Sequence, residues 1–424
     1  MHRQIKLLLT TIILLSTVGI STAQTRTYSP TSRYGIGEMN YRGFGRNEAM
    51  GGTGIGVQTP RHLNSLNPAS YSAIDSLNFF FEVGVSGNSN TLSHNDQSQT
   101  FSDIYFDYFA IGFPVSPRVR TSFGVKPVSQ AGYQFEIIQS PQDNPVLQSA
   151  IGTGNISSAY GGVGIKISDD LNLGVHASYW FGNIKHTSFS EFLGDNIRVH
   201  GLQNHHQINS FLFDFGVQYN VNEQLTLGAV FRPRTPMRGK TSTTLATGRQ
   251  YQLDGSLFFN SDTISSSTLR WNNNEFEMPM NLGVGASYRF NERFLLAMDY
   301  STQRWSSANF PDDISQTVNT NMLSLGAELV PNERTATRYF QRVRYRAGLR
   351  YYEDYLQYNN NQITDFGMTF GLGLPVGRTF TSINLGFEYG MRGTSDSNDL
   401  SETYTRFTLN FTMQEFWFRQ RRFD

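Results

Sequence analysis

Residues 281–290 read Asn-Leu-Gly-Val-Gly-Ala-Ser-Tyr-Arg-Phe, and in this stretch apolar residues alternate with polar or small ones without a break. Because successive side chains of a β-strand point to opposite faces, the alternation predicts a strand with one apolar face. The same pattern recurs in residues 379–391 and 402–415. One face suits lipid and the other a polar interior. In lipid every backbone polar group must be paired internally, so such strands predict a closed barrel.

The alternation continues in both directions and covers the chain from Leu77 onward. We predict an all-β fold, a 14-stranded antiparallel transmembrane β-barrel, with strands at 77–88, 102–115, 118–132, 154–168, 170–187, 206–221, 223–235, 276–290, 292–305, 319–330, 341–353, 363–375, 379–391 and 402–415. Short turns and long polar loops alternate between these strands, and the longest loop runs from about Thr235 to Glu275. A soluble β-sandwich is the alternative, but soluble strands average about five or six residues.

Composition excludes several classes of protein. The 424 residues contain 34 Lys+Arg and 34 Asp+Glu, so the formal net charge is zero and a nucleic-acid partner is not expected. The absence of Cys excludes disulfides, thiolate nucleophiles and Cys-ligated zinc. Charged residues make up only 16% of the chain, which disfavours an ordinary soluble enzyme.

The N-terminus has the pattern of a secretory signal: Arg3 and Lys6, an apolar run to Ile20, then small residues up to Ala23. We expect cleavage of this signal and insertion of the mature protein into the outer membrane. The predicted regions are the signal peptide 1–23, an N-terminal hatch or plug 24–76 inside the barrel, the barrel 77–418 and a basic periplasmic tail 419–424.

Four cations share one face of the strand 341–353, opposite its apolar face. They are Arg342, Arg344, Arg346 and Arg350. A charge facing lipid at mid-depth costs about 2–4 kcal/mol, so these side chains are expected to point into the lumen. The acidic residues assigned to the same interior are Glu82, Asp103, Asp107, Asp214, Asp299, Glu328 and Asp365. Two interpretations stay open: ion pairs that hold the wall to the plug, or an anion-binding site for a substrate carboxylate.

Two other features were considered as functional sites. Pro127 removes a ladder donor from its strand and Gly132 follows it, which indicates a kink that opens the wall sideways or an ordinary bulge. His176 and Ser178 share the inner face of one strand, but this pair lacks the positioned partners that nucleophilic catalysis needs. We therefore predict no enzymatic activity, no catalytic residue, no metal site and no cofactor.

The segment before the first strand carries three motifs in order. They are Gly43-Phe44-Gly45-Arg46, the Gly-rich Ala49 to Gly56, and Asn67-Pro68-Ala69. This order resembles the N-terminal hatch of the FadL/TodX family, the long-chain fatty-acid transporters of the outer membrane. The resemblance implies a barrel plugged by its N-terminus that passes hydrophobic molecules toward a lateral opening, with Asn67, Pro68 and Ala69 as the hatch motif. Thr59 to His62 replace acidic residues common in the family.

Two functions follow from this resemblance. The first is passive uptake of hydrophobic, fatty-acid-like molecules through the hatch and a lateral opening. The alternative is a non-transporting barrel that is a subunit or partner of an outer-membrane secretion or assembly complex. The expected partners are outer-membrane lipid, a hydrophobic ligand such as a fatty acid or detergent, and other outer-membrane proteins or lipoproteins.

Overall fold

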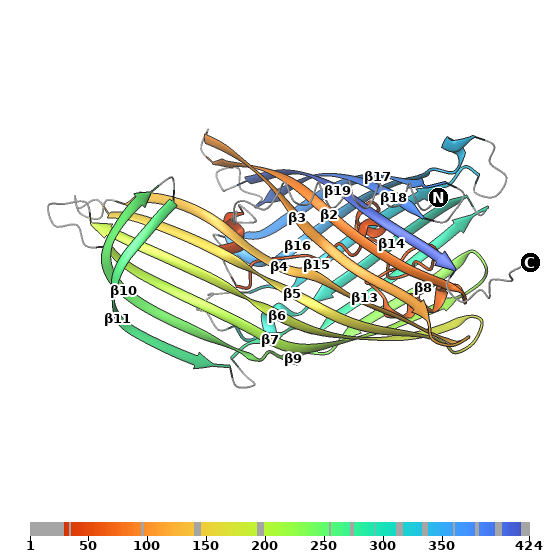
Figure 1. Cartoon of the computed structure of the whole chain (residues 1–424), viewed down its shortest axis with the longest axis horizontal. Coiled ribbons are helices and arrows are strands. Elements are labelled where there is room, and N and C mark those ends of the chain that lie inside the picture. The colour runs from red at the N-terminus through yellow and green to blue at the C-terminus, as the bar shows by residue number, and fades with distance from the viewer. Residues whose placement is uncertain are drawn as a thin grey trace, which may run out of the picture.

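A computed structural model describes residues 29–33, 35–94, 97–139, 146–192, 199–253, 256–271, 275–291, 293–310, 317–332, 338–358, 361–377, 381–394 and 401–416. Long antiparallel strands wind around one axis and close into a barrel (Figure 1). The first barrel strand pairs with the last, from Asn78↔Phe416 to Ser93↔Ser401, so the sheet has no open edge at this junction.

The predicted fourteen-stranded barrel is confirmed in the described part of the chain. Its strands are β2 (Asn78–His94), β3 (Gln97–Pro114), β4 (Val119–Gln139), β5 (Val146–Lys166), β6 (Leu171–Phe192), β7 (Val199–Asn220), β8 (Leu225–Arg232), β13 (Asn281–Phe290), β14 (Phe294–Gln303), β15 (Thr320–Leu329), β16 (Arg344–Tyr358), β17 (Asn361–Pro375), β18 (Ser382–Gly393) and β19 (Ser401–Phe416). The predicted signal segment and basic tail lie outside the described residues.

The strands differ in length more than the sequence patterns predicted. β4 to β7 have 21 or 22 residues, whereas β13, β14 and β15 have 10 each. The extra residues of the long strands are mostly polar, such as Asn204 and Gln207, and they continue the pairing beyond the apolar band. One side of the barrel wall is therefore taller than the other at the end that carries the long loops.

The longest predicted loop is largely β-structure. Residues 235–275 contain β9 (Thr235–Pro236), β10 (Gly239–Leu253) and β11 (Ser256–Arg270), and β9 pairs with β12 (Glu277–Met278). β10 pairs with the upper part of β7 from Gly239↔Ile208 to Gly248↔Val199. The hairpin thus extends the tall side of the wall at the end of the molecule drawn at the left of Figure 1. The expectation of a loop was wrong because alternating Thr and Ser residues satisfy strand geometry as well as loop composition.

The outward face of the strands is apolar. Exposed Leu385, Leu409 and Val85 lie side by side across β18, β19 and β2, and Phe387 and Phe407 form the next row. The inward row between them contains Thr408 and Gly386, as the alternation predicted. This is the face that an outer-membrane barrel presents to lipid.

Leu409→Arg is expected to reduce insertion far more than Thr403→Arg. Both side chains lie on the outward face of β19, but Leu409 is in the apolar band and Thr403 is six residues nearer the long loops. An arginine costs about 2–4 kcal/mol at the bilayer midplane and about 0–1 kcal/mol near the interface. The fraction of heat-modifiable protein in the outer-membrane fraction measures the difference, and equal yields would contradict the assignment of the lipid face.

The N-terminal segment lies inside the barrel, where its red ribbon is surrounded by the strands in Figure 1. It contains η1 (Pro30–Arg33), β1 (Glu38–Met39), α2 (Gly45–Glu48) and η2 (Pro68–Ala73). Further short helical turns are η4 (Trp305–Ser307) and η5 (Tyr339–Gln341). Among the described residues, no helix has the length and apolar character needed to cross a membrane.

Candidate functional site

The Asn67-Pro68-Ala69 motif rests on a platform of glycines on the inner wall. Gly164, Gly174 and Gly216 are directly paired neighbours on β5, β6 and β7. A Cβ at Gly174 would overlap the backbone of Pro68 and Ala69, and one at Gly216 would overlap the Asn67 amide. Glycine is needed at these positions because the backbone of the segment touches the backbone of the wall.

Hydrogen bonds fix the same motif. The Asn67 side-chain amide donates to the carbonyl oxygens of Ile55 at 2.8 Å and of Val217 on β7 at 3.1 Å. Its side-chain oxygen accepts from the Ala69 backbone N–H at 3.0 Å and caps η2. The motif therefore joins the Gly-rich stretch, the short helix and the barrel wall.

The Gly-rich stretch is held by polar side chains of the wall. The Asp299 carboxylate on β14 accepts from the backbone N–H groups of Gly54 at 2.6 Å and Ile55 at 2.8 Å. Gln218 donates to the Ile55 carbonyl at 2.9 Å, and Ser287 donates to the Gly56 carbonyl at 2.8 Å. A segment with little regular structure thus has its backbone groups satisfied by three different strands.

A first buried ion-pair cluster joins α2 to β15 and β16. The Glu328 carboxylate accepts from Arg46 at 2.9 and 3.1 Å and from Arg346 at 2.7 Å. Arg346 also donates to Asn384 at 2.9 Å and lies 3.3 Å from the ring nitrogen Nε2 of His62. All of these charged side chains are buried, so the cluster connects the N-terminal segment to the wall without intervening solvent.

A second cluster joins the segment to β16, β17, β18 and β19. Arg350 donates to Glu388 at 2.7 Å and to the Tyr404 hydroxyl at 2.8 Å, and that hydroxyl donates to Asp365 at 2.7 Å. Arg392 donates to Asp365 at 3.2 Å. From the N-terminal segment, Glu38 accepts from Arg392 at 2.6 Å and Arg42 lies 3.3 Å from Glu388.

The predicted lumenal charge network is only partly the observed one. Arg344, Arg346 and Arg350 are buried on the inner face, but Arg342 lies before β16 and donates to the Gly377 carbonyl in the adjacent turn. Asp107 is buried and bonded to Ser86 on β2, and Asp103 lies on the same strand, β3. The described ion pairs of Arg346 and Arg350 are with Glu328, Asp365 and Glu388. Residues missed by sequence reasoning are Glu38, Arg42, Arg46, Arg392 and Glu402.

The wall is incomplete between β3 and β4. These strands pair only from Phe109↔Val125 to Pro114↔Arg120. Further along β4, the register of its pairing with β5 shifts between Pro127 and Ser129. Along its other edge β3 pairs with β2 from Gln97 to Gly112. The freed edge of β4 is occupied from within, because β1 pairs with Ser129 and Gln130 and the Ser29 N–H donates to the Gly132 carbonyl at 3.0 Å. Pro127 and Gly132 thus border a seam that the N-terminal segment lines.

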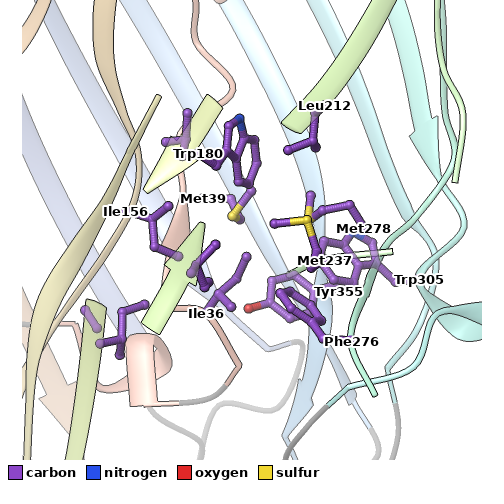
Figure 2. Close-up of a cluster of buried hydrophobic side chains, with 14 of the residues drawn as sticks. Ile36, Met39, Ile156, Trp180, Leu212, Met237, Phe276, Met278, Trp305 and Tyr355 are labelled. Atoms are coloured by element: carbon purple, nitrogen blue, oxygen red, sulfur yellow. The ribbon is translucent and has the colours of Figure 1, made fainter. Parts of the chain in front are cut away.

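An apolar cluster fills the lumen between the N-terminal segment and the long loops (Figure 2). Trp180 and Ile156 come from the wall, Ile36 and Met39 from the N-terminal segment, and Met237 from the region after β8. The remaining labelled members are Leu212, Phe276, Met278, Trp305 and Tyr355, with the last two rings stacked at 4.4 Å. Side chains from the wall, the segment and the loops therefore pack together at this end of the barrel.

A cavity of about 130 Å³ remains between this cluster and the Gly-rich stretch. Its lining includes Lys126, His176, Ser178, Asp214 and Arg232. Arg232 pairs with Asp214 at 2.6 Å, His176 lies 3.5 Å from the same carboxylate, and Ser178 donates to the Leu212 carbonyl at 3.5 Å. The volume is below the roughly 300–1,000 Å³ typical of pockets for drug-sized ligands. His176 and Ser178 share this cavity without forming a described hydrogen bond to each other.

Solved structures similar to this chain include a hydrocarbon channel and a toluene transporter. The CymD monoaromatic hydrocarbon channel aligns with a TM-score of 0.59 and 14% identity, over 90% of this chain and 100% of its own. The toluene transporter TodX of P. putida gives 0.58 and 15%, with coverage of 90% and 100%. A FadL homologue of Pseudomonas aeruginosa gives 0.58 and 12%, with coverage of 90% and 99%. These matches confirm the resemblance for the fold.

At the level of sequence, a family model described as BamG matches residues 1–424, the whole chain. No curated protein matches the chain.

Proposed function

The chain belongs to the BamG family, and we propose that it acts as a sealed, non-transporting barrel subunit of a protein complex in the outer membrane. The observation that carries the proposal is the way in which the N-terminal segment is fixed in the lumen. In two buried ion-pair clusters, centred on Glu328 and Glu388, Arg46 of the segment pairs with Glu328 on β15, and Arg42 and Glu38 pair with Glu388 and Arg392 on β18. A plug that moves during each transport cycle would have to break these pairs.

The energetic argument favours a permanent plug. Breaking a buried ion pair by removing one partner costs about 3–5 kcal/mol, and a moving segment would carry Glu38, Arg42 and Arg46 away from their partners in the wall. Hydrogen bonds to the Asp299 carboxylate, and from the Gln218 and Ser287 side chains, add to the barrier. The apolar cluster occupies part of the lumen, and the cavity described beside it, of about 130 Å³, is small for a long hydrophobic ligand. In this reading the barrel supplies a rigid membrane scaffold and its outer parts bind other proteins.

Uptake of hydrophobic molecules is the second candidate, and the seam between β3 and β4 favours it. The fold is that of hydrocarbon and fatty-acid channels. The apolar cluster that begins at Met39 and Trp180 lies next to the segment that lines this seam. Transport along this route requires β1 to leave the edge of β4, which would expose the Ser129 and Gln130 backbone.

Reconstitution in liposomes separates the two candidates. Liposomes that contain the wild-type barrel are expected to take up a fluorescent fatty acid and toluene at the same rate as protein-free liposomes. A variant lacking Asn67–Ala69 serves as the opened comparison, and its permeability is expected to rise because the motif no longer joins the segment to the wall. Saturable uptake by the wild-type protein above the protein-free rate would overturn the sealed reading and support transport.

A further inference from the structure

The most exposed regular element in the described part of the chain is β11. Every residue from Asp262 to Arg270 is exposed, on both faces of the strand. The two apolar residues of this exposed stretch, Ile264 and Leu269, are 55% and 52% exposed. One edge of β11 pairs with β10. Among the described residues, no pairing joins its other edge to another strand. A strand with a free edge and two exposed faces is a template for another strand.

The strand is held firmly although it is exposed. β10 supports it on one side along its whole length and is itself paired with ten residues of β7. Trp271 follows β11 directly, is buried, and donates to Thr241 at 3.0 Å. Its ring packs edge-on against Phe276, 5.3 Å away, in the apolar cluster. The free edge therefore needs little ordering before it binds, which favours affinity.

The usual protection of edge strands is sparse in β11. Proteins shield such edges with charges, prolines, bulges or shortness. From Thr263 to Leu269 the strand has no charge and no proline, and the single irregularity in its pairing with β10 is at Ile264. Ser265 to Leu269 form a regular, uncharged stretch beyond it. β10 pairs with β7 beyond the part of β7 that pairs with β8, and β11 lies on the outer side of β10.

The charges at the base of the hairpin indicate what the edge binds. Arg270 lies directly opposite Lys240 on β10, and both are exposed. Like charges directly opposite each other on paired strands are destabilising. A carboxylate approaching from the free side would offset this repulsion. The site therefore fits an extended, otherwise uncharged protein segment that places an acidic residue beside Arg270.

We propose that the free edge of β11, from Ser265 to Arg270, is the strand-pairing site for a partner protein of the outer-membrane complex. This inference rests on the proposed function and names its docking surface. Recognition is through main-chain hydrogen bonds to the edge, with side-chain contacts from Leu269 and the acidic residue at Arg270. A second copy of this chain is the competing occupant.

The test uses complexes extracted from the native outer membrane in a mild detergent. Arg270→Glu and Ser266→Lys place charge against the partner strand, and each is expected to lower the amount of partner per barrel at least tenfold. Arg270→Lys and Ser266→Ala keep the charge and the backbone, and they are expected to retain the partner within twofold. Heat-modifiability of each variant verifies that the barrel is folded.

Hydrogen exchange identifies the surface independently of these variants. About half of the amides of residues 262–270 are expected to exchange at least tenfold more slowly in the wild-type complex than in the isolated barrel, because alternate N–H groups point to the free edge. Equal exchange in both states, retention of the partner by the charged variants, or a dimer of this chain alone would overturn the proposal. If the wild-type protein is extracted without any partner, the proposed function itself fails.

Discussion

Glu328→Ala is expected to lower the free energy of unfolding by about 3–5 kcal/mol, because it leaves Arg46 and Arg346 buried without their shared counter-charge. The loss concerns the link between the N-terminal segment and the wall, so the segment should also become more accessible to protease. Urea unfolding of the reconstituted barrel, followed by tryptophan fluorescence, measures the change.

Two controls make this expectation specific. Asp169→Ala removes a surface pair with Lys166, and its unfolding midpoint should match that of the wild type because exposed ion pairs contribute little. The triple variant Arg46→Met, Glu328→Leu, Arg346→Met replaces the whole cluster with apolar side chains and should recover most of the lost stability. If Glu328→Ala unfolds at the wild-type midpoint, the cluster does not hold the segment.

Gly174→Val should be destabilised by about 3 kcal/mol or more, because the new side chain meets backbone atoms of Pro68 and Ala69 that cannot rotate away. The Asn67-Pro68-Ala69 turn would have to leave the wall, and its hydrogen bonds to Ile55 and Val217 would be lost with it. Permeability of liposomes to hydrophobic probes should rise in parallel with the loss of stability.

Gly87→Val is the matched control on the wall. An added Cβ there meets no atom closer than 3.8 Å, so the variant should fold and seal like the wild type. If Gly174→Val also behaves like the wild type, the turn does not rest on the glycine platform.

The barrel could be predicted from the sequence because lipid and lumen require different residue types on the two faces of each strand. In β13, β18 and β19, every second side chain must suit lipid, and that period survives in the residues themselves. Strand length was harder to predict. Above the lipid, β6 and β7 continue as paired strands with Asn, Gln and His on both faces, so nothing in the pattern marks where a strand ends. For the same reason the pattern of residues 235–275 predicts a loop where the structure has β10 and β11.

The candidate site could be predicted only in part. Glu328, Arg346, Arg350 and Asp365 could be placed in the lumen from strand parity, and Glu388 stood on the inner face of its predicted strand. Their partners Glu38, Arg42 and Arg46 could not, because the N-terminal segment has no period that reports its contacts. Arg342 was misplaced because β16 begins at Arg344, three residues after the predicted start at 341, so Arg342 precedes the strand. Pairing across the lumen depends on tertiary structure that no local pattern contains.

The most direct test of the central claim is native mass spectrometry of the chain extracted from its own outer membrane in a mild detergent. A sealed, non-transporting subunit predicts a discrete assembly that contains this barrel and at least one other outer-membrane protein in a fixed ratio. A free barrel that carries bound fatty acid or hydrocarbon, with no other protein, would contradict it.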